Sequence, residues 1–190
     1  RFFSNVERKE DVNQNVKGTF HAKNRAGEET FMHLFLPASG KTYYRAKSPA
    51  VKTAGRQYAH QPLPLFTMRS EKEAWSQPFI AIFEPSKNKA GGTITSVERI
   101  PELCNDQNTV IHVRHADGSA QFIFQGNNDE TIVKGENFSF SGYFGVISLD
   151  SNGKLDQIYL GKGKHISYGD RILTAEDVSG AGWMKVSNLR

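Results

Sequence analysis

Short alternating runs of apolar and polar residues dominate the chain, and these runs are rich in Val, Ile, Thr, Phe and Tyr. Apolar positions at helical spacing are almost absent. The alternation is typical of β-strands, because successive side chains of a strand point to opposite sides of the sheet. We expect strands at Val16–Lys23, Glu29–Leu36, Lys41–Arg45, Leu65–Ser70, Gln77–Phe83, Thr93–Ile100, Thr109–Arg114, Ala120–Phe124, Glu130–Val133, Asn137–Ser141, Phe144–Asp150, Lys154–Gly161, Lys164–Ser167, Asp170–Leu173 and Gly182–Ser187.

Three dipeptides between these runs predict tight hairpin turns. Asp117-Gly118 and Asn152-Gly153 each separate two alternating segments, and Gly169-Asp170 follows the same pattern. Such dipeptides accept the positive φ that matches a turn to the twist of paired strands. We therefore expect antiparallel hairpins at all three places.

Turn signals recur about every eight to twelve residues, a spacing typical of sandwiches. We predict an all-β fold, a large antiparallel β-sandwich of about 12–15 short strands, with residues 1–190 forming a single domain. The proline-rich segment Pro49–Pro64 is expected to be a long connection, because proline cannot donate to a central ladder. A short helix is weakly indicated at residues 71–75.

Composition excludes several classes of protein. No apolar run approaches the roughly 18 residues of a membrane-spanning helix, so we expect no membrane span. The chain has 24 Lys and Arg against 20 Asp and Glu, a net charge of +4. This mild excess, without basic residues interleaved with aromatic ones, argues against nucleic-acid binding. The glycines of Gly161–Lys164 lie between two expected strands and open no helix, so we interpret them as a charged hairpin.

Neither a metal nor a cofactor is expected. The six histidines do not form the closely spaced pairs, supported by a carboxylate, that indicate zinc. Cys104 is the only cysteine, so it has no partner for an intrachain disulfide and is interpreted as a packed thiol.

The chain begins at Arg1 without an initiator Met or a leader pattern. We therefore expect it to be part of a longer protein.

His33 allows two interpretations. It lies in a strand whose two faces are both apolar, which favours a buried, hydrogen-bonded core histidine. Alternatively, His33, Tyr44, Arg45 and His60 converge on a sugar acid. The Arg would then neutralise a carboxylate, and the Tyr or His would move a proton. Tyr43 and Tyr44 point to opposite faces of their strand, so at most one of them joins His33.

Several segments resemble, in their order and in their pattern of apolar and aromatic residues, the C-terminal β-sheet region of heparinase II/III-like polysaccharide lyases. The most specific is the Gln77–Pro85 run, in which Pro-Phe-Ile-Ala-Ile-Phe-Glu-Pro follows Gln77. The others are His33–Pro37, Tyr43–Pro49, Pro64–Arg69 and Ile94–Ile100.

The resemblance implies a parent enzyme that cleaves uronic-acid polysaccharides by β-elimination and carries an upstream α-helical toroid. Nothing in the present chain is expected to be helical enough to supply that toroid. Phe20-His21-Ala22 lacks the Asp-Ala-Gly that accompanies the family's histidine motif. We therefore expect no catalytic residue in this chain. The expected role is to brace the toroid and line a cleft, with an acidic polysaccharide and the toroid as partners, in the periplasm or outside the cell.

A different class of function stays open at this point. The 13 Phe and 6 Tyr residues also suit a free-standing β-sandwich that binds carbohydrate or protein and has no enzymatic role. Exposed aromatic rings on strands would stack on the apolar face of a sugar.

Overall fold

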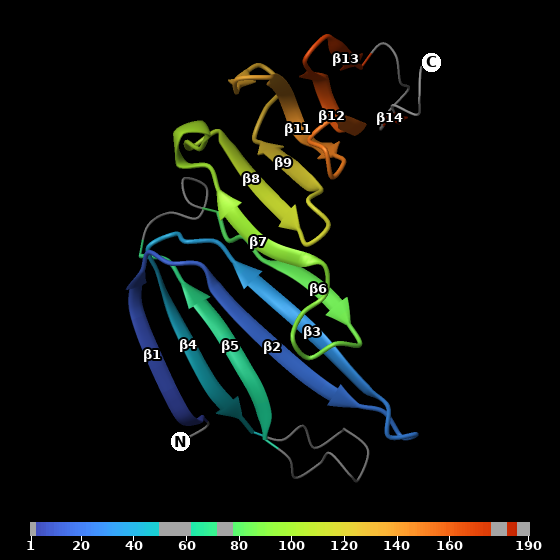
Figure 1. Ribbon diagram of the computed structural model, residues 1–190. Coiled ribbons are helices and arrows are strands. Elements are labelled where there is room, and N and C mark those ends of the chain that lie inside the picture. Colours follow the sequence, from blue (N-terminus) through green and yellow to red (C-terminus); the bar gives the residue numbers. More distant parts are fainter. Residues whose placement is uncertain (1–2, 50–61, 72–77, 176–181, 186–190) are drawn as a thin grey trace. The chain divides into compact units, whose positions relative to one another are not determined.

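A computed structural model describes residues 3–49, 62–71, 78–175 and 182–185. These residues form 14 strands and one turn of 3-10 helix, Pro101–Leu103, with no α-helix among them. Every strand pairing is antiparallel. The predicted all-β fold is confirmed (Figure 1). The expected helix at residues 71–75 and most of the Pro49–Pro64 connection lie outside the described residues.

The chain divides into two compact units. Unit 1 comprises Arg1–Gln14 and Ala38–Phe79 and holds a three-stranded sheet. Its strand order is β1 (Ser4–Val12), β4 (Lys41–Ser48) and β5 (Leu63–Arg69). Whether residues 1–190 act as one domain stays a prediction.

Unit 2 comprises Asn15–Pro37 and Ile80–Arg190 and contains two sheets. The smaller has the strand order β2 (Val16–Lys23), β3 (Glu29–Leu36) and β6 (Ile82–Ser86). The larger has eight strands, of which six follow the order β13-β12-β11-β9-β8-β7, while β10 pairs with β11 and β14 pairs with β12. Its strands are β7 (Ile94–Arg99), β8 (Asn108–His115), β9 (Ala120–Gly126), β10 (Val133–Lys134), β11 (Phe138–Leu149), β12 (Leu155–Tyr168), β13 (Arg171–Thr174) and β14 (Gly182–Lys185).

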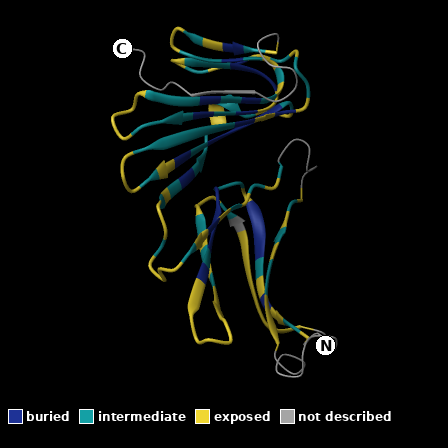
Figure 2. Ribbon diagram, turned by 90° about the vertical axis from the view of Figure 1, so that its right-hand side faces the viewer, coloured by how far each residue is buried: buried dark blue, intermediate teal, exposed yellow. Residues whose placement is uncertain are grey.

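The eight-stranded sheet buries apolar side chains on both of its faces. One face carries the larger core, which includes Phe124, Phe140 and Ile147. Within the described part of unit 2, the opposite face is covered at β7, β8 and Ile123 of β9, where Val97 and Ile111 pack with Phe35 of β3. The two sheets of unit 2 therefore form a sandwich-like arrangement over part of the larger sheet. Figure 2 shows how burial is distributed along the strands.

The three predicted hairpin turns are confirmed, since they connect β8 to β9, β11 to β12, and β12 to β13. Gly118 has a φ of 87° and Gly153 a φ of 75°. An L-residue with a side chain seldom adopts such angles, so glycine permits both turns.

Several strand boundaries differ from the sequence-based expectation. β1 was not expected, because Ser4–Val12 is almost entirely polar and shows no apolar alternation. Charged residues suit this strand, since it lies at a sheet edge and pairs only with β4. The strand expected at Gln77–Phe83 begins only at Ile82 and continues through Pro85. Proline is accepted there because β6 is also an edge strand. β10 has two residues, not the four expected for Glu130–Val133.

Two predicted strand breaks are β-bulges. β11 and β12 each run without interruption where the sequence indicated two strands, so the charged hairpin predicted at Gly161–Lys164 is wrong. Their register shifts repeatedly between Ser141 and Gly145. Gly142 and Gly163 pair at this point, and a Cβ on Gly163 would lie 2.5 Å from the Cα of Gly142. Glycine thus allows the two backbones to approach closely and keeps both strands continuous.

Two adjacent buried polar side chains hold the segment between β6 and β7. His33 and Glu84 are cross-strand partners on β3 and β6. His33 Nε2 lies 2.9 Å from the carbonyl oxygen of Asn88. Glu84 Oε1 accepts hydrogen bonds from the Ile94 N–H at 2.9 Å and from the Thr93 N–H and hydroxyl. We call His33 and Glu84 the polar clasp, because together they attach the smaller sheet to the first strand of the larger one.

Burial and these hydrogen-bond donors both affect the pKa of the Glu84 carboxyl group. Burial raises its pKa, but the N–H groups of Ile94 and Thr93 outweigh that effect, so the pKa lies below its usual value. A carboxyl group with a lowered folded-state pKa stabilises the fold above its unfolded-state pKa. That contribution disappears as the pH falls through the folded-state pKa.

We expect Gly163→Ala to lower the free energy of unfolding by about 1–3 kcal/mol, the usual effect of forcing atoms into a packed site. Gly18→Ala is the matched control, because its Cβ would lie 3.8 Å from that of Leu34. This control should be neutral or stabilising by up to about 1 kcal/mol. Denaturant unfolding followed by circular dichroism measures both variants. Equal stability of Gly163→Ala and the unchanged chain would contradict the close backbone approach.

We expect Glu84→Gln to lose about 1–3 kcal/mol of stability at neutral pH, because a charged acceptor of buried hydrogen bonds is lost. The variant should also lose less stability than the parent chain on acidification below the ordinary glutamate pKa. Glu98→Gln, which removes an exposed ion pair with Arg114, is the control and should change stability by less than about 1 kcal/mol. Unfolding measured from neutral to acidic pH tests this. Indistinguishable acid profiles for Glu84→Gln and the parent chain would refute the role of Glu84.

Candidate functional site

The residues predicted to bind a sugar acid are distributed over both units. His33 lies on β3 in unit 2, whereas Tyr44 and Arg45 are neighbours on β4 in unit 1. His60 lies outside the described residues. Because Tyr44 and Arg45 are consecutive in a strand, their side chains point to opposite faces of the sheet. The binding role of these four residues stays a prediction.

His33 has the surroundings of a structural histidine. Its side chain is fully buried, at 0% exposure. Nδ1 lies 3.0 Å from the Thr19 hydroxyl, and Nε2 bonds to the Asn88 carbonyl. Both ring nitrogens therefore have protein partners, and this arrangement supports the interpretation as a hydrogen-bonded core residue.

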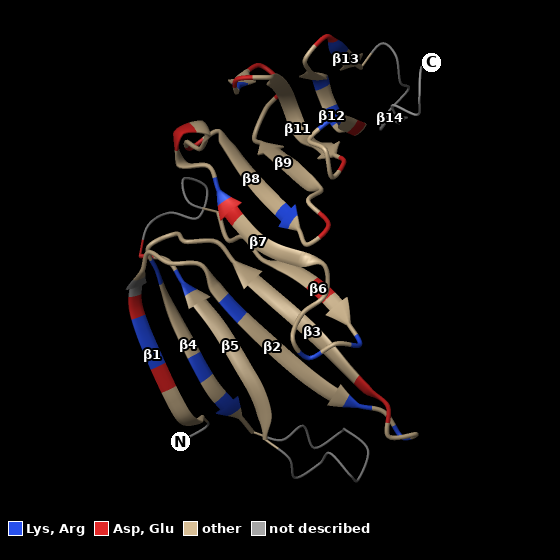
Figure 3. Cartoon of the chain, viewed as in Figure 1, with Lys and Arg blue, Asp and Glu red and all other residues tan. Residues whose placement is uncertain are grey.

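Charged side chains are concentrated on the sheet of unit 1, and Figure 3 shows both signs along β1. Arg8 lies over the ring of Tyr44, with 5.9 Å between Cζ and the ring centroid, and it also pairs with Glu10 at 2.7 Å. Arg45 lies 3.9 Å from Glu7 and is exposed. Each of these two arginines thus already has an acidic neighbour, which weakens its attraction for an added anion.

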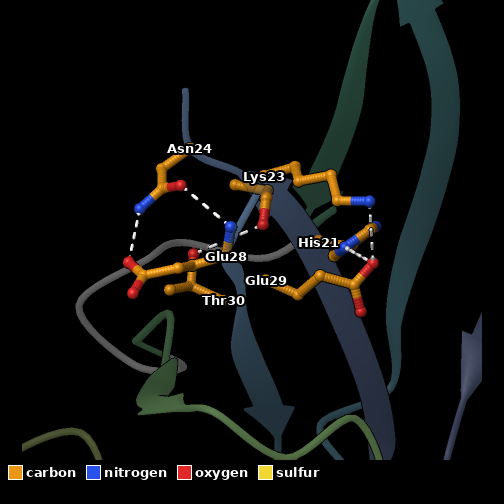
Figure 4. A network of polar contacts seen from close by, with 7 residues as sticks. His21, Lys23, Asn24, Glu28, Glu29 and Thr30 are labelled. Atoms are coloured by element: carbon orange, nitrogen blue, oxygen red, sulfur yellow. Dashed lines mark hydrogen bonds and ion pairs between the residues drawn. The ribbon is translucent and has the colours of Figure 1, made fainter. Parts of the chain in front are cut away.

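A second polar cluster lies at the tip of the β2–β3 hairpin (Figure 4). Glu29 lies 3.5 Å from His21 Nε2 and 3.6 Å from Lys23 Nζ. Asn24 donates to Glu28 at 2.7 Å and accepts from its backbone N–H. These side chains are exposed and satisfy one another, so the cluster stabilises the hairpin turn.

An open face lies on the eight-stranded sheet beyond the part covered by β3 and β6. It consists of the half-buried side chains Gln121, Ile123, Val146, Ser148, Gln157 and Tyr159. Cross-strand pairing places them on one face, since Val146 pairs with Ile123 and Tyr159, and Ser148 with Gln121 and Gln157. β9 and β11 contain no Asp, Glu, Lys or Arg (Figure 3). The open face is therefore an uncharged, polar and aromatic surface.

One end of the open face is hollowed. A cavity of about 420 Å³ lies between the β8–β9 and β11–β12 turns, and Gln121, Ser148 and Gln157 contribute to its lining. Asp117 and Asp150 line it as well. Hydrogen bonds from Ser119 lower the pKa of Asp117, and the N–H of Lys154 lowers that of Asp150. Both carboxylates are thus ionised and hold their own turns, so the hollow is acidic.

The other end of the open face carries exposed rings. We call Tyr143, Phe144, Tyr159 and Lys162 the aromatic platform. Tyr143 is 37% exposed and Phe144 is 42% exposed. Lys162 Nζ lies 4.2 Å from the centroid of the Tyr143 ring, and the rings of Phe144 and Tyr159 meet edge to face at 6.0 Å. Sequence reasoning missed this cluster, because it interpreted residues 142–143 and 161–164 as connections between strands.

Gly161 lets the rings of the aromatic platform pack closely. A Cβ at this position would lie 3.0 Å from Phe144 Cδ1 and 3.1 Å from Tyr159 Cε1. These distances are shorter than most real Cβ contacts, so a side chain would push the two rings apart. The glycine-rich segment thus has a role in positioning aromatic side chains.

Other kinds of site receive less support from the described residues. Those residues contain no group of three or more His, Cys, Asp and Glu placed to hold a metal ion. No helix within the described ranges is long and apolar enough to cross a membrane. The thiol of Cys104 packs beside the larger core, and its Sγ accepts a hydrogen bond from the Val110 N–H at 3.2 Å.

Comparison with known proteins relates the chain to polysaccharide lyases. Residues 94–185 match the family described as Endo-acting ulvan lyase C-terminal domain. This match runs from the first residue of β7 to the last residue of β14, which is the extent of the eight-stranded sheet. An Endo-acting ulvan lyase of Formosa agariphila is 27% identical over 186 residues, or 95% of the chain. The chain spans 22% of the length of that relative. No solved structure matches. The chain is thus similar to the C-terminal domain of a polysaccharide lyase, and it carries the open face and the aromatic platform on the part that matches.

Proposed function

We propose that the chain is a non-catalytic β-module that presents an acidic polysaccharide to a polysaccharide lyase. The observation that carries this proposal is the match of the eight-stranded sheet to the C-terminal domain of ulvan lyases. The substrate class follows from the relative's name, and ulvan is accordingly the first polysaccharide to test. The parent enzyme would act by β-elimination and carry an upstream helical toroid, as the resemblance to heparinase II/III-like lyases implies. Such an enzyme would work in the periplasm or outside the cell.

The requirements of β-elimination support a non-catalytic role. One sugar must meet a group that neutralises its carboxylate, a base that removes the adjacent proton and an acid that protonates the leaving oxygen. Tyr44 and Arg45 point to opposite faces of β4, and both ring nitrogens of His33 already have partners. These residues therefore do not offer one sugar the combination that the reaction needs. A module without that combination contributes by holding the polymer near the catalytic groups, which raises its local concentration.

We expect the 190-residue chain to bind ulvan without cleaving it. Elimination produces an unsaturated uronate that absorbs in the near ultraviolet, so absorbance is followed with ulvan, heparin, heparan sulfate, chondroitin and alginate. Affinity electrophoresis with the same polysaccharides measures binding. Retention by ulvan with constant absorbance is the expected result.

Two outcomes would contradict the proposal. Rising absorbance that is abolished by Tyr44→Phe or His60→Ala would make the chain a catalyst and those residues part of its active site. Equal retention by acidic and neutral polysaccharides, or no retention by any of them, would favour the alternative of a free-standing binding domain outside lyase chemistry.

A further inference from the structure

The shifts in register between β11 and β12 explain why two consecutive aromatic side chains are exposed. In a regular strand one of two neighbours points to each face, and here one face is the larger core. The pairing changes from Gly142–Gly163 to Phe144–Lys162, which leaves Tyr143 as an extra residue on β11. Tyr143 and Phe144 are both exposed, whereas Gly142 and Gly145 on either side of them are buried. The bulge thus leaves both rings exposed at the surface.

The aromatic platform combines apolar area with one positive charge. Exposed rings stack on the apolar face of a sugar. Lys162 is exposed and interacts with the ring of Tyr143, a contact that is weak at a solvated site. Its ammonium group is therefore free to turn toward an anion on a bound sugar. Lys164 lies two residues further along β12 and is exposed as well.

Charge distinguishes the two ends of the open face. Asp117, Asp150 and Asp156 line the hollow, and they would repel a carboxylate or sulfate group. The aromatic platform carries Lys162, and neither β9 nor β11 places a carboxylate between the two ends. An anionic sugar is thus favoured at the platform and disfavoured at the hollow.

We propose that the aromatic platform is a subsite that binds one anionic sugar ring of an acidic polysaccharide. Tyr143 and Phe144 stack on the ring, and Lys162 pairs with its carboxylate or sulfate group. Tyr159 and Gly161 fix the position of Phe144. This inference rests on the proposed function and assigns the binding of the polysaccharide to the four side chains of the aromatic platform.

Binding of ulvan to the 190-residue chain and its variants, measured by isothermal titration calorimetry, tests the subsite. Tyr143→Ala, Phe144→Ala and Lys162→Met should each weaken binding by about tenfold, the loss of one stacking or ionic contact. Tyr143→Phe keeps the ring and should bind within about threefold of the parent chain. Raising the salt concentration should weaken the parent chain more than Lys162→Met. Circular dichroism confirms that each variant is folded.

Arg8→Met is the matched control, because it removes another cation in contact with an aromatic ring, on unit 1. It should leave affinity unchanged. Loss of affinity in this control, with Tyr143→Ala and Lys162→Met unaffected, would overturn the platform while leaving the proposed function intact. If the parent chain binds no acidic polysaccharide, the proposed function fails as well. If Tyr143→Ala alters only self-association in size-exclusion chromatography, the platform is a protein contact and the proposal fails.

Three further probes identify the anion. Alginate carries only carboxylates, dextran sulfate only sulfate esters, and dextran neither. Binding of one or both charged polymers, dependent on Lys162, supports the subsite and assigns the group it prefers. Equal binding of dextran would contradict an anionic ligand.

Discussion

The two sheets of unit 2 depend on the polar clasp formed by His33 and Glu84. These side chains are buried next to each other, and their hydrogen bonds hold the segment from Asn88 to Ile94 that leads into β7. A buried polar group without a partner is strongly destabilising, so the segment and the two side chains depend on one another. Attachment at this edge places the smaller sheet over β7 and β8. The same face of β11 and β12 carries half-buried side chains of the open face.

The sequence predicted those parts of the fold that local chemistry determines. Asp117-Gly118 and Asn152-Gly153 form the expected turns because their glycines accept positive φ. Strands β2 and β3 have the predicted boundaries. β1 could not be predicted in this way. Its polar side chains carry no apolar pattern, and it exists because β4 offers it an edge.

Glycine residues explain both the strand breaks that were wrongly predicted in β11 and β12 and the aromatic platform that was not predicted. A strand pattern interrupted by Gly142 or by Gly161–Lys164 indicates a break when only neighbours in sequence are considered. In the folded chain Gly142 and Gly163 face each other across β11 and β12, where a side chain would not fit. That close approach depends on the partner strand, so periodicity along one strand does not reveal it. The sequence allowed His33 to be interpreted as a binding residue, because its position in the strand does not show that both of its ring nitrogens have hydrogen-bond partners.

We propose that an acidic polysaccharide binds the middle of β11 and β12. Amide chemical shifts of the isotopically labelled chain, followed by nuclear magnetic resonance during titration with ulvan oligosaccharides, test it most directly. We expect the largest changes at residues 142–146 and 159–164, with little change in β1, β4 and β5. Largest changes in those three strands, with β11 and β12 unaffected, would contradict it.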